Sequence, residues 1–121
     1  MVRLIISKAG SITITKALAS MMNFDAKKPA LLILSDEQYP ADIYIRPAFG
    51  ADPDAFPLSR LKSGKMTISP AVGSGIVSYL RRTLAIEGTW SFPVVPCNEI
   101  ATKTWTVCVK QGKEILMGGV R

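Results

Sequence analysis

The residues most able to do chemistry in this sequence are cations beside two glycine turns. Lys8 precedes Gly10, and Lys62 and Lys65 flank Gly64. Fifteen Lys and Arg against nine Asp and Glu give a formal net charge of +6. This balance favours a polyanionic partner, because each cation that meets a phosphate releases condensed counterions. We therefore expect the chain to bind DNA through a set of cations in and around the turns: Lys8, Lys16, Arg60, Lys62, Lys65, Arg81 and Arg82.

Other kinds of site find little support. The chain has no histidine, which excludes Ser-His and Cys-His nucleophiles and His-based metal sites. The acidic pairs Asp36-Glu37 and Asp52/Asp54 lack the ligand array that calcium needs, so we interpret them as solvated loop charges. The run 73–75 (Gly-Ser-Gly) lacks the rest of a dinucleotide-binding motif. We expect no catalytic residue, no metal and no cofactor, and hence no enzyme.

Composition indicates an ordinary globular chain. Hydrophobic residues make up 48% and charged residues 20% of the 121 positions, enough to form a buried core. The longest apolar runs, such as 30–34, are far shorter than a membrane span, and the N-terminal run 4–6 is too short for a signal peptide. We therefore expect a cytoplasmic protein without a membrane partner. Cys97 and Cys108 are expected as thiols, with a disulfide as the alternative.

An internal repeat positions the two turns. Residues 8–15 recur as residues 62–69, with Lys, Gly, Thr and Ile identical in place. Each copy predicts a glycine turn, then a half-buried strand, then Thr15 or Ser69 as the cap of a helix. The first helix is predicted over 16–22, with Leu18, Met21 and Met22 on its apolar face. The second begins near Pro70, and its glycines predict a late start or a break.

Two strands are predicted after each helix. These are 30–34 and 43–45 in the first half, and 90–95 and 104–109 in the second, with a last strand at 114–117. The proline-rich segment 47–59 reads as a surface linker. The sequence thus predicts one mainly β domain over 1–121 with two short helices. We interpret it as a pseudo-two-fold duplication of a strand–helix–strand–strand unit, with 1–46 and 60–121 as the two units.

The first 46 residues resemble the AbrB/MazE-type swapped-hairpin DNA-binding family. The resemblance rests on residues 7–18 and 21–24 and on the closing strands 31–34 and 42–46, with a possible second copy in 60–110. It implies that two units interleave and that basic turns and helix starts meet DNA, as in a transcriptional regulator or antitoxin. The sequence departs from the family at Thr15, where the family has proline, and at Ala19, where it often has arginine.

Two alternatives remain open. One is a protein–protein module, for example a structural subunit of a phage or mobile element, with exposed edge strands that add to a partner's sheet. The other is a single-strand binder that stacks bases on Trp90, Phe92 and Trp105, although strand positions favour these residues as core. Either a monomer or a homodimer is compatible with the sequence.

Overall fold

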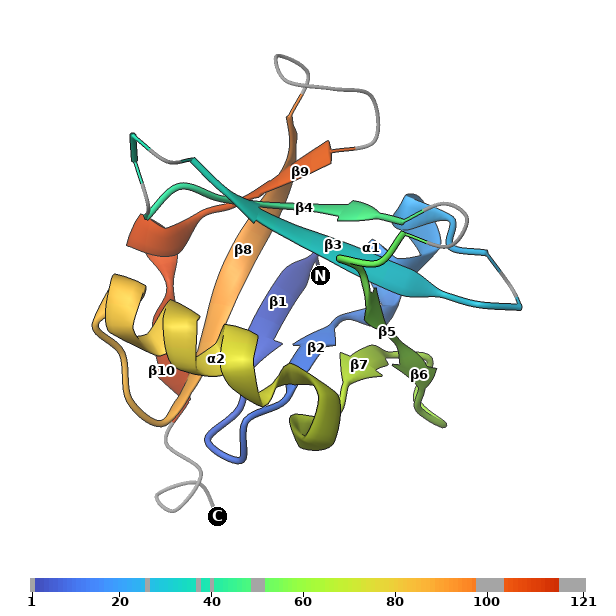
Figure 1. The fold of residues 1–121 in the computed structure, drawn as a ribbon, viewed down its shortest axis with the longest axis horizontal. Coiled ribbons are helices and arrows are strands. Elements are labelled where there is room, and N and C mark those ends of the chain that lie inside the picture. Colours follow the sequence, from blue (N-terminus) through green and yellow to red (C-terminus); the bar gives the residue numbers. More distant parts are fainter. Residues whose placement is uncertain are drawn as a thin grey trace.

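Antiparallel strands form the largest part of the regular secondary structure, as the alternating sequence pattern predicts (Figure 1). The computed structural model describes residues 2–25, 27–36, 38–39, 41–48, 52–97 and 104–115. Ten strands in this part of the chain belong to one sheet. In chain order, the elements are β1 (Arg3–Ile6), β2 (Ile12–Ile14), α1 (Lys16–Met22), β3 (Ala30–Ser35), β4 (Ile43–Pro47), β5 (Phe56–Pro57), β6 (Ser59–Arg60), β7 (Met66–Ile68), α2 (Pro70–Leu84), β8 (Thr89–Cys97), β9 (Thr104–Val107), the 3-10 helix η1 (Val109–Gln111) and β10 (Lys113–Ile115).

The sheet curls almost completely onto itself as a barrel. Its strand order is β5-β3-β4-β9-β8-β1-β2-β7-β6, with β10 beside β8. The two ends of this order, β5 and β6, are separated in the chain only by the buried Leu58. One bent segment therefore pairs with β3 on one side and with β7 on the other. The segment 47–59, which we expected to be a surface linker, thus contributes strands. The sequence did not predict them because Pro53 and Pro57 interrupt the alternating pattern of a strand.

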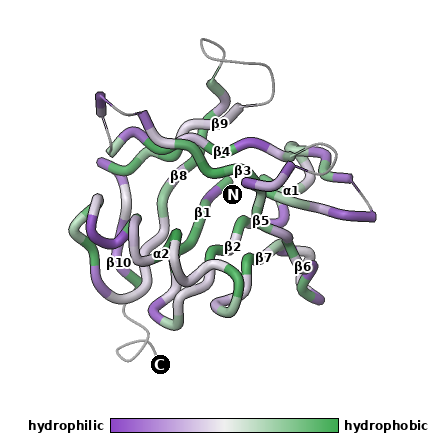
Figure 2. The backbone as a smooth tube through the Cα atoms, viewed as in Figure 1, coloured by the Kyte–Doolittle hydropathy of each residue, from purple (hydrophilic) through white to green (hydrophobic). Residues whose placement is uncertain are grey.

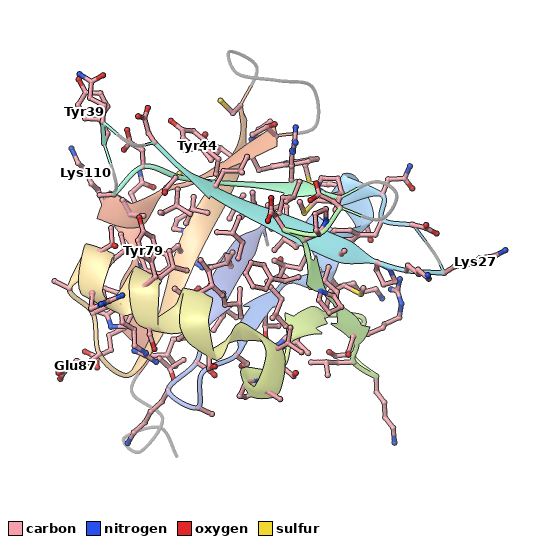
Figure 3. The ribbon with its side chains drawn as sticks, viewed as in Figure 1. Lys27, Tyr39, Tyr44, Tyr79, Glu87 and Lys110 are labelled. Carbon is pink, nitrogen blue, oxygen red and sulfur yellow. The ribbon has the colours of Figure 1, made fainter. Side chains whose placement is uncertain are left out.

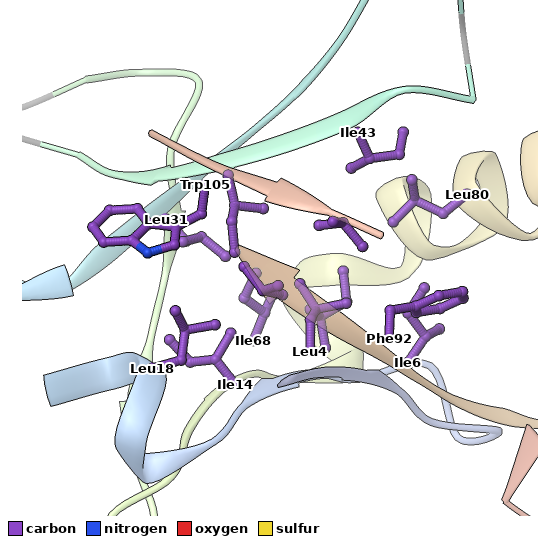
Figure 4. Close-up of a cluster of buried hydrophobic side chains, with 14 of the residues drawn as sticks. Leu4, Ile6, Ile14, Leu18, Leu31, Ile43, Ile68, Leu80, Phe92 and Trp105 are labelled. Carbon is purple, nitrogen blue, oxygen red and sulfur yellow. The ribbon is translucent and has the colours of Figure 1, made fainter. Parts of the chain in front are cut away.

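Alternate strand residues fill the barrel, as Figure 4 shows for part of the core. Each fully buried aliphatic side chain contributes about 1.5–3 kcal/mol to stability. Hydrophobic residues follow the strands, whereas hydrophilic ones gather in the turns and at the ends (Figure 2). The residues between the buried positions point outward, where they are available for contacts. The inward set includes Leu4, Ile6, Ile12, Ile14, Leu31, Ile43, Ile45, Met66, Ile68, Phe92, Val94, Trp105 and Val107.

Both helices differ in detail from expectation. In α1, Leu18 and Met22 are buried, but Met21, which was expected on the same apolar face, is exposed. The predicted late start or break of α2 is wrong: the helix runs unbroken from Pro70 to Leu84. A Cβ at Gly73 would lie 2.9 Å from the Ile68 Cγ2, so this glycine serves close packing and not helix termination.

Three smaller expectations also differ. Thr15 and Ser69 occupy the N-cap positions, but neither side chain makes a capping hydrogen bond. Thr15 Oγ1 instead accepts a hydrogen bond from the backbone N–H of Arg3 at 3.1 Å. Strand β9 ends at Val107, and Val109 belongs to η1, so the predicted strand 104–109 is too long. The last strand begins at Lys113, while residues 116 and 117 lie outside the described residues.

The two halves carry matching local geometry. The turn over residues 7–11, here the first turn, has Ser7 N donating to Ser11 O at 2.9 Å. The turn over residues 61–65, the second turn, has Leu61 N donating to Lys65 O at 2.8 Å. Their glycines have φ of 100° and 93°. Strands β2 and β7 pair with Thr13 opposite Thr67, so a local two-fold axis passes between these residues. Duplication as the origin of this likeness stays a prediction.

Candidate nucleic-acid interface

The two turns lie at opposite ends of the β2–β7 pair (Figure 1). Each approaches the first residue of the other half's helix: a Cβ at Gly10 would lie 3.8 Å from the Pro70 Cβ, and one at Gly64 would lie 2.8 Å from the Lys16 Cδ. Gly64 and Pro70 are six residues apart along the segment that contains β7. At roughly 3.3 Å per residue the turns are about 20 Å apart. They are therefore two separate contact points, one at each end of the β2–β7 pair.

The second turn carries the denser group of cations. The aliphatic part of Lys16 lies directly on Gly64, which holds the start of α1 against a turn that contains Lys62 and Lys65. Arg60, in β6, pairs with Met66 at the base of the same turn. All four cationic side chains are exposed. Like charges this close repel one another, so an anion bound between them would relieve an unfavourable interaction.

The first turn is built differently. Lys8 is exposed, and its backbone N–H donates to Thr89 Oγ1 at 2.9 Å. Arg81 Nη2 donates to the carbonyl oxygen of Ser7 at 2.6 Å, which ties α2 to this turn. Arg82 is exposed one residue further along α2. Where the second end has Lys16, this end has Pro70. Lys8, Arg81 and Arg82 are thus gathered at one end, and Lys16, Arg60, Lys62 and Lys65 at the other.

Small hydroxyl side chains cover the outer face between the turns. Thr13 Oγ1 and Thr67 Oγ1 lie 3.0 Å apart on the local two-fold axis, and Ser7 Oγ and Ser11 Oγ lie 2.6 Å apart in the first turn. Short side chains let a ligand approach the strands closely. Serine and threonine hydroxyls and backbone N–H groups are common partners of phosphate oxygens.

Charge is segregated along the chain. Residues 1–24 and 55–86 contain eight Lys and Arg and none of the nine acidic residues. These two segments supply β1, β2, β5, β6, β7 and both helices. The net charge alone led to the expected DNA contact, although the separation of acidic from basic residues is also evident in the sequence. It also missed Arg3, whose Nε donates to Ser91 Oγ at 2.6 Å on the outer side of β1.

The aromatic residues divide between core and surface. Trp105 is 6% exposed and Phe92 is 1% exposed, which makes both core residues and removes them as stacking surfaces for bases. Trp90 is only half-buried, and its ring stacks on Phe92 with centroids 6.1 Å apart. The indole N–H of Trp90 donates to the carbonyl oxygen of Glu87 at 2.8 Å. Trp90 alone of the three stays accessible.

The remaining chemical candidates are dispersed. Asp52 Oδ1 accepts a hydrogen bond from Asp54 N, and Asp36 Oδ1 accepts one from Gln38 N, as in ordinary polar loops. Glu37 lies outside the described residues. Among the residues that the structure describes, no three acidic or cysteine side chains are grouped as metal ligands. Cys97 and Cys108 are not bonded to each other, because the pairing of Cys97 with Thr104 puts Cys108 four residues further along.

Comparison with known proteins gives no independent indication of family or function. No protein-family model, curated protein or solved structure matches the chain. The resemblance to the AbrB/MazE-type family therefore stays a prediction, and any function has to be argued from the geometry. Within the described residues, neither helix has the length and apolar character that crossing a membrane requires.

Proposed function

We propose that this protein binds double-stranded DNA through the outer face of β1, β2 and β7 and the two turns at its ends. The observation that carries the proposal is the charge segregation: the segments that form β1, β2, β5, β6, β7 and both helices hold eight cations and no acid. A cationic, acid-free surface raises the local concentration of a polyanion and gains free energy from counterion release.

Binding is expected to tolerate many sequences. The groups at hand are lysines, arginines, hydroxyls and the backbone N–H groups of tight turns, which contact phosphates and carry little base information. The spacing of about 20 Å between the turns corresponds to roughly six base-pair steps of 3.4 Å along the duplex axis. Each turn would therefore contact a separate stretch of phosphates, with the hydroxyl face between them.

Fluorescence anisotropy with labelled duplexes of unrelated sequence tests the proposal. At low salt we expect similar affinity for all of them. The double variant Lys8→Glu/Lys62→Glu reverses the charge of one exposed lysine in each turn and should abolish most of this binding. The matched control is Lys27→Glu/Lys28→Glu, which makes the same change in net charge at exposed residues, of which Lys27 extends away from the barrel (Figure 3). Absence of duplex binding by the unaltered protein at low salt would refute the proposal.

A second candidate function is contact with another protein. On the opposite side of the barrel, Leu34, Tyr44, Thr106 and Val95 lie side by side across β3, β4, β9 and β8. Leu34 is 38% and Val95 is 45% exposed, and a row of neighbouring apolar residues is the kind of surface that contacts another protein. If this row is an interface, Leu34→Lys/Val95→Lys should abolish self-association or partner capture and leave duplex binding unchanged.

A further inference from the structure

An open groove lies beside the first turn, between the end of α2 and the strands β8 and β10. Arg81, Arg82, Glu87, Trp90 and Glu114 line it. Glu87 belongs to the loop that joins α2 to β8 (Figure 3). The groove combines an aromatic surface with two cations and two carboxylates.

The groove and the first turn are directly connected. Arg81 lines the groove and also donates to the carbonyl oxygen of Ser7. Thr89 accepts the hydrogen bond of the Lys8 N–H and immediately precedes Trp90. The first turn and the groove therefore share Arg81 and adjoin at the start of β8, which places the groove close to a nucleic acid held at Lys8.

The Trp90 ring is prepared for stacking. Phe92 packs nearly parallel to it, with an interplanar angle of 19°, and the indole N–H is already satisfied by Glu87 O. Both contacts fix the ring, so little conformational freedom is lost when a planar ligand stacks on it. Stacking of a base on a protein aromatic ring is tolerant of sequence and contributes substantially to affinity.

The carboxylates indicate which part of a nucleotide enters. Glu87 and Glu114 are exposed acids at the margin of an otherwise acid-free surface, and they would repel a phosphate backbone lying over the groove. Carboxylates accept hydrogen bonds from the N–H groups of bases, while arginine donates to phosphate and carbonyl oxygens. The lining therefore suits a base more than a backbone, and guanine offers adjacent N–H donors together with a carbonyl acceptor.

We propose that this groove binds an unpaired guanine base adjoining the duplex that the first turn holds, stacked on Trp90 and hydrogen-bonded to the carboxylates. The inference rests on the proposed duplex binding and specifies its substrate as DNA with a junction between paired and unpaired strands.

The test compares a blunt duplex of about 16 base pairs with the same duplex carrying one unpaired deoxyguanosine or thymidine at its ends, at a salt concentration that leaves the electrostatic contacts intact. The unpaired deoxyguanosine should quench the Trp90 emission and raise affinity about ten-fold. Trp90→Leu should remove this advantage and leave affinity for the blunt duplex unchanged, and Trp90→Phe should retain part of it. Glu87→Gln, at an exposed residue, should abolish the preference for guanine over thymine.

The outcomes separate the two proposals. If the blunt duplex binds but the unpaired guanine changes neither emission nor affinity, the groove inference is wrong and duplex binding stands. If the blunt duplex does not bind at low salt, the proposed function itself fails. Equal gains from guanine and thymine, unaffected by Glu87→Gln, would overturn the role of the carboxylates.

Discussion

Replacing Lys62 and Lys65 by glutamine should weaken the salt dependence of DNA binding by an amount that the structure sets. Both side chains belong to the second turn and are exposed, and the aliphatic part of Lys16 packs on Gly64 between them. Glutamine keeps a polar side chain of similar length and removes only the charge. The conformation of the turn depends on Gly64 and on backbone hydrogen bonds, so it should persist in the variant.

The size of the effect follows from counting phosphate contacts. Five cations sit at the turns or the start of α1 with no protein hydrogen bond from their charged groups among those described: Lys8, Lys16, Arg60, Lys62 and Lys65. If each neutralises one phosphate, log K should fall against log salt with a slope of about −4.5, a loss of roughly 500-fold between 50 and 200 mM. With two contacts removed the slope should be about −2.7 and the loss roughly 40-fold.

The assay is anisotropy of a labelled duplex titrated at several salt concentrations. Lys27→Gln/Lys28→Gln is the matched control, since it makes the same change in net charge through two adjacent exposed lysines that belong to neither turn. Its slope should stay near that of the unaltered protein. If the control lowers the slope as much as Lys62→Gln/Lys65→Gln does, binding reflects net charge alone, and the argument from the turns is refuted.

Three further predictions use single residues. Gly64→Ala should destabilise the protein by about 1–3 kcal/mol in chemical denaturation, because φ is 93° there and the new methyl group meets the stem of Lys16; unchanged stability would contradict this contact. Gly75→Ala should stabilise the protein by about 0.5–1 kcal/mol, since no atom lies within 4 Å of the new methyl group. Gly73→Ala should destabilise it by about 1–3 kcal/mol, because the methyl group would collide with Ile68. Equal effects of the two substitutions in thermal or urea unfolding would disprove the packing argument. Pro70→Lys supplies the cation that the first end lacks and should steepen the salt slope by about 0.9, while Gln38→Lys in the distant β3–β4 turn should not.

Local sequence patterns predicted most of the elements because each has its own chemical signal. The glycine turns, the alternation in β2 and β7 and the helix formers of α1 depend on neighbouring residues only. The pairing of strands was beyond such reasoning. Nothing in residues 56–60 reveals that Leu58 is buried and that its neighbours pair with β3 and β7, since those contacts come from distant parts of the chain.

Part of the candidate site could be predicted from the sequence. The lysines of the turns were found from the repeat, but the contact of Lys16 with Gly64 and the groove at Trp90 required three-dimensional contacts. Gly73 was misread because glycine is unfavourable in an isolated helix, whereas here the close approach of Ile68 requires it. The uneven distribution of acids was available from the sequence, and a count by segment would have found it.

The strand order has a consequence for how the chain must fold. Leu4 in β1 pairs with Phe92 in β8, and Thr13 in β2 pairs with Thr67 in β7, so each half completes its core with strands from the other. During synthesis the first half therefore has no finished core until β8 has left the ribosome, and its apolar strand edges stay open meanwhile. Closing such long loops makes a high-contact-order protein that we expect to fold slowly, in milliseconds to seconds. Since both halves are tethered in one chain, this rate should be independent of protein concentration.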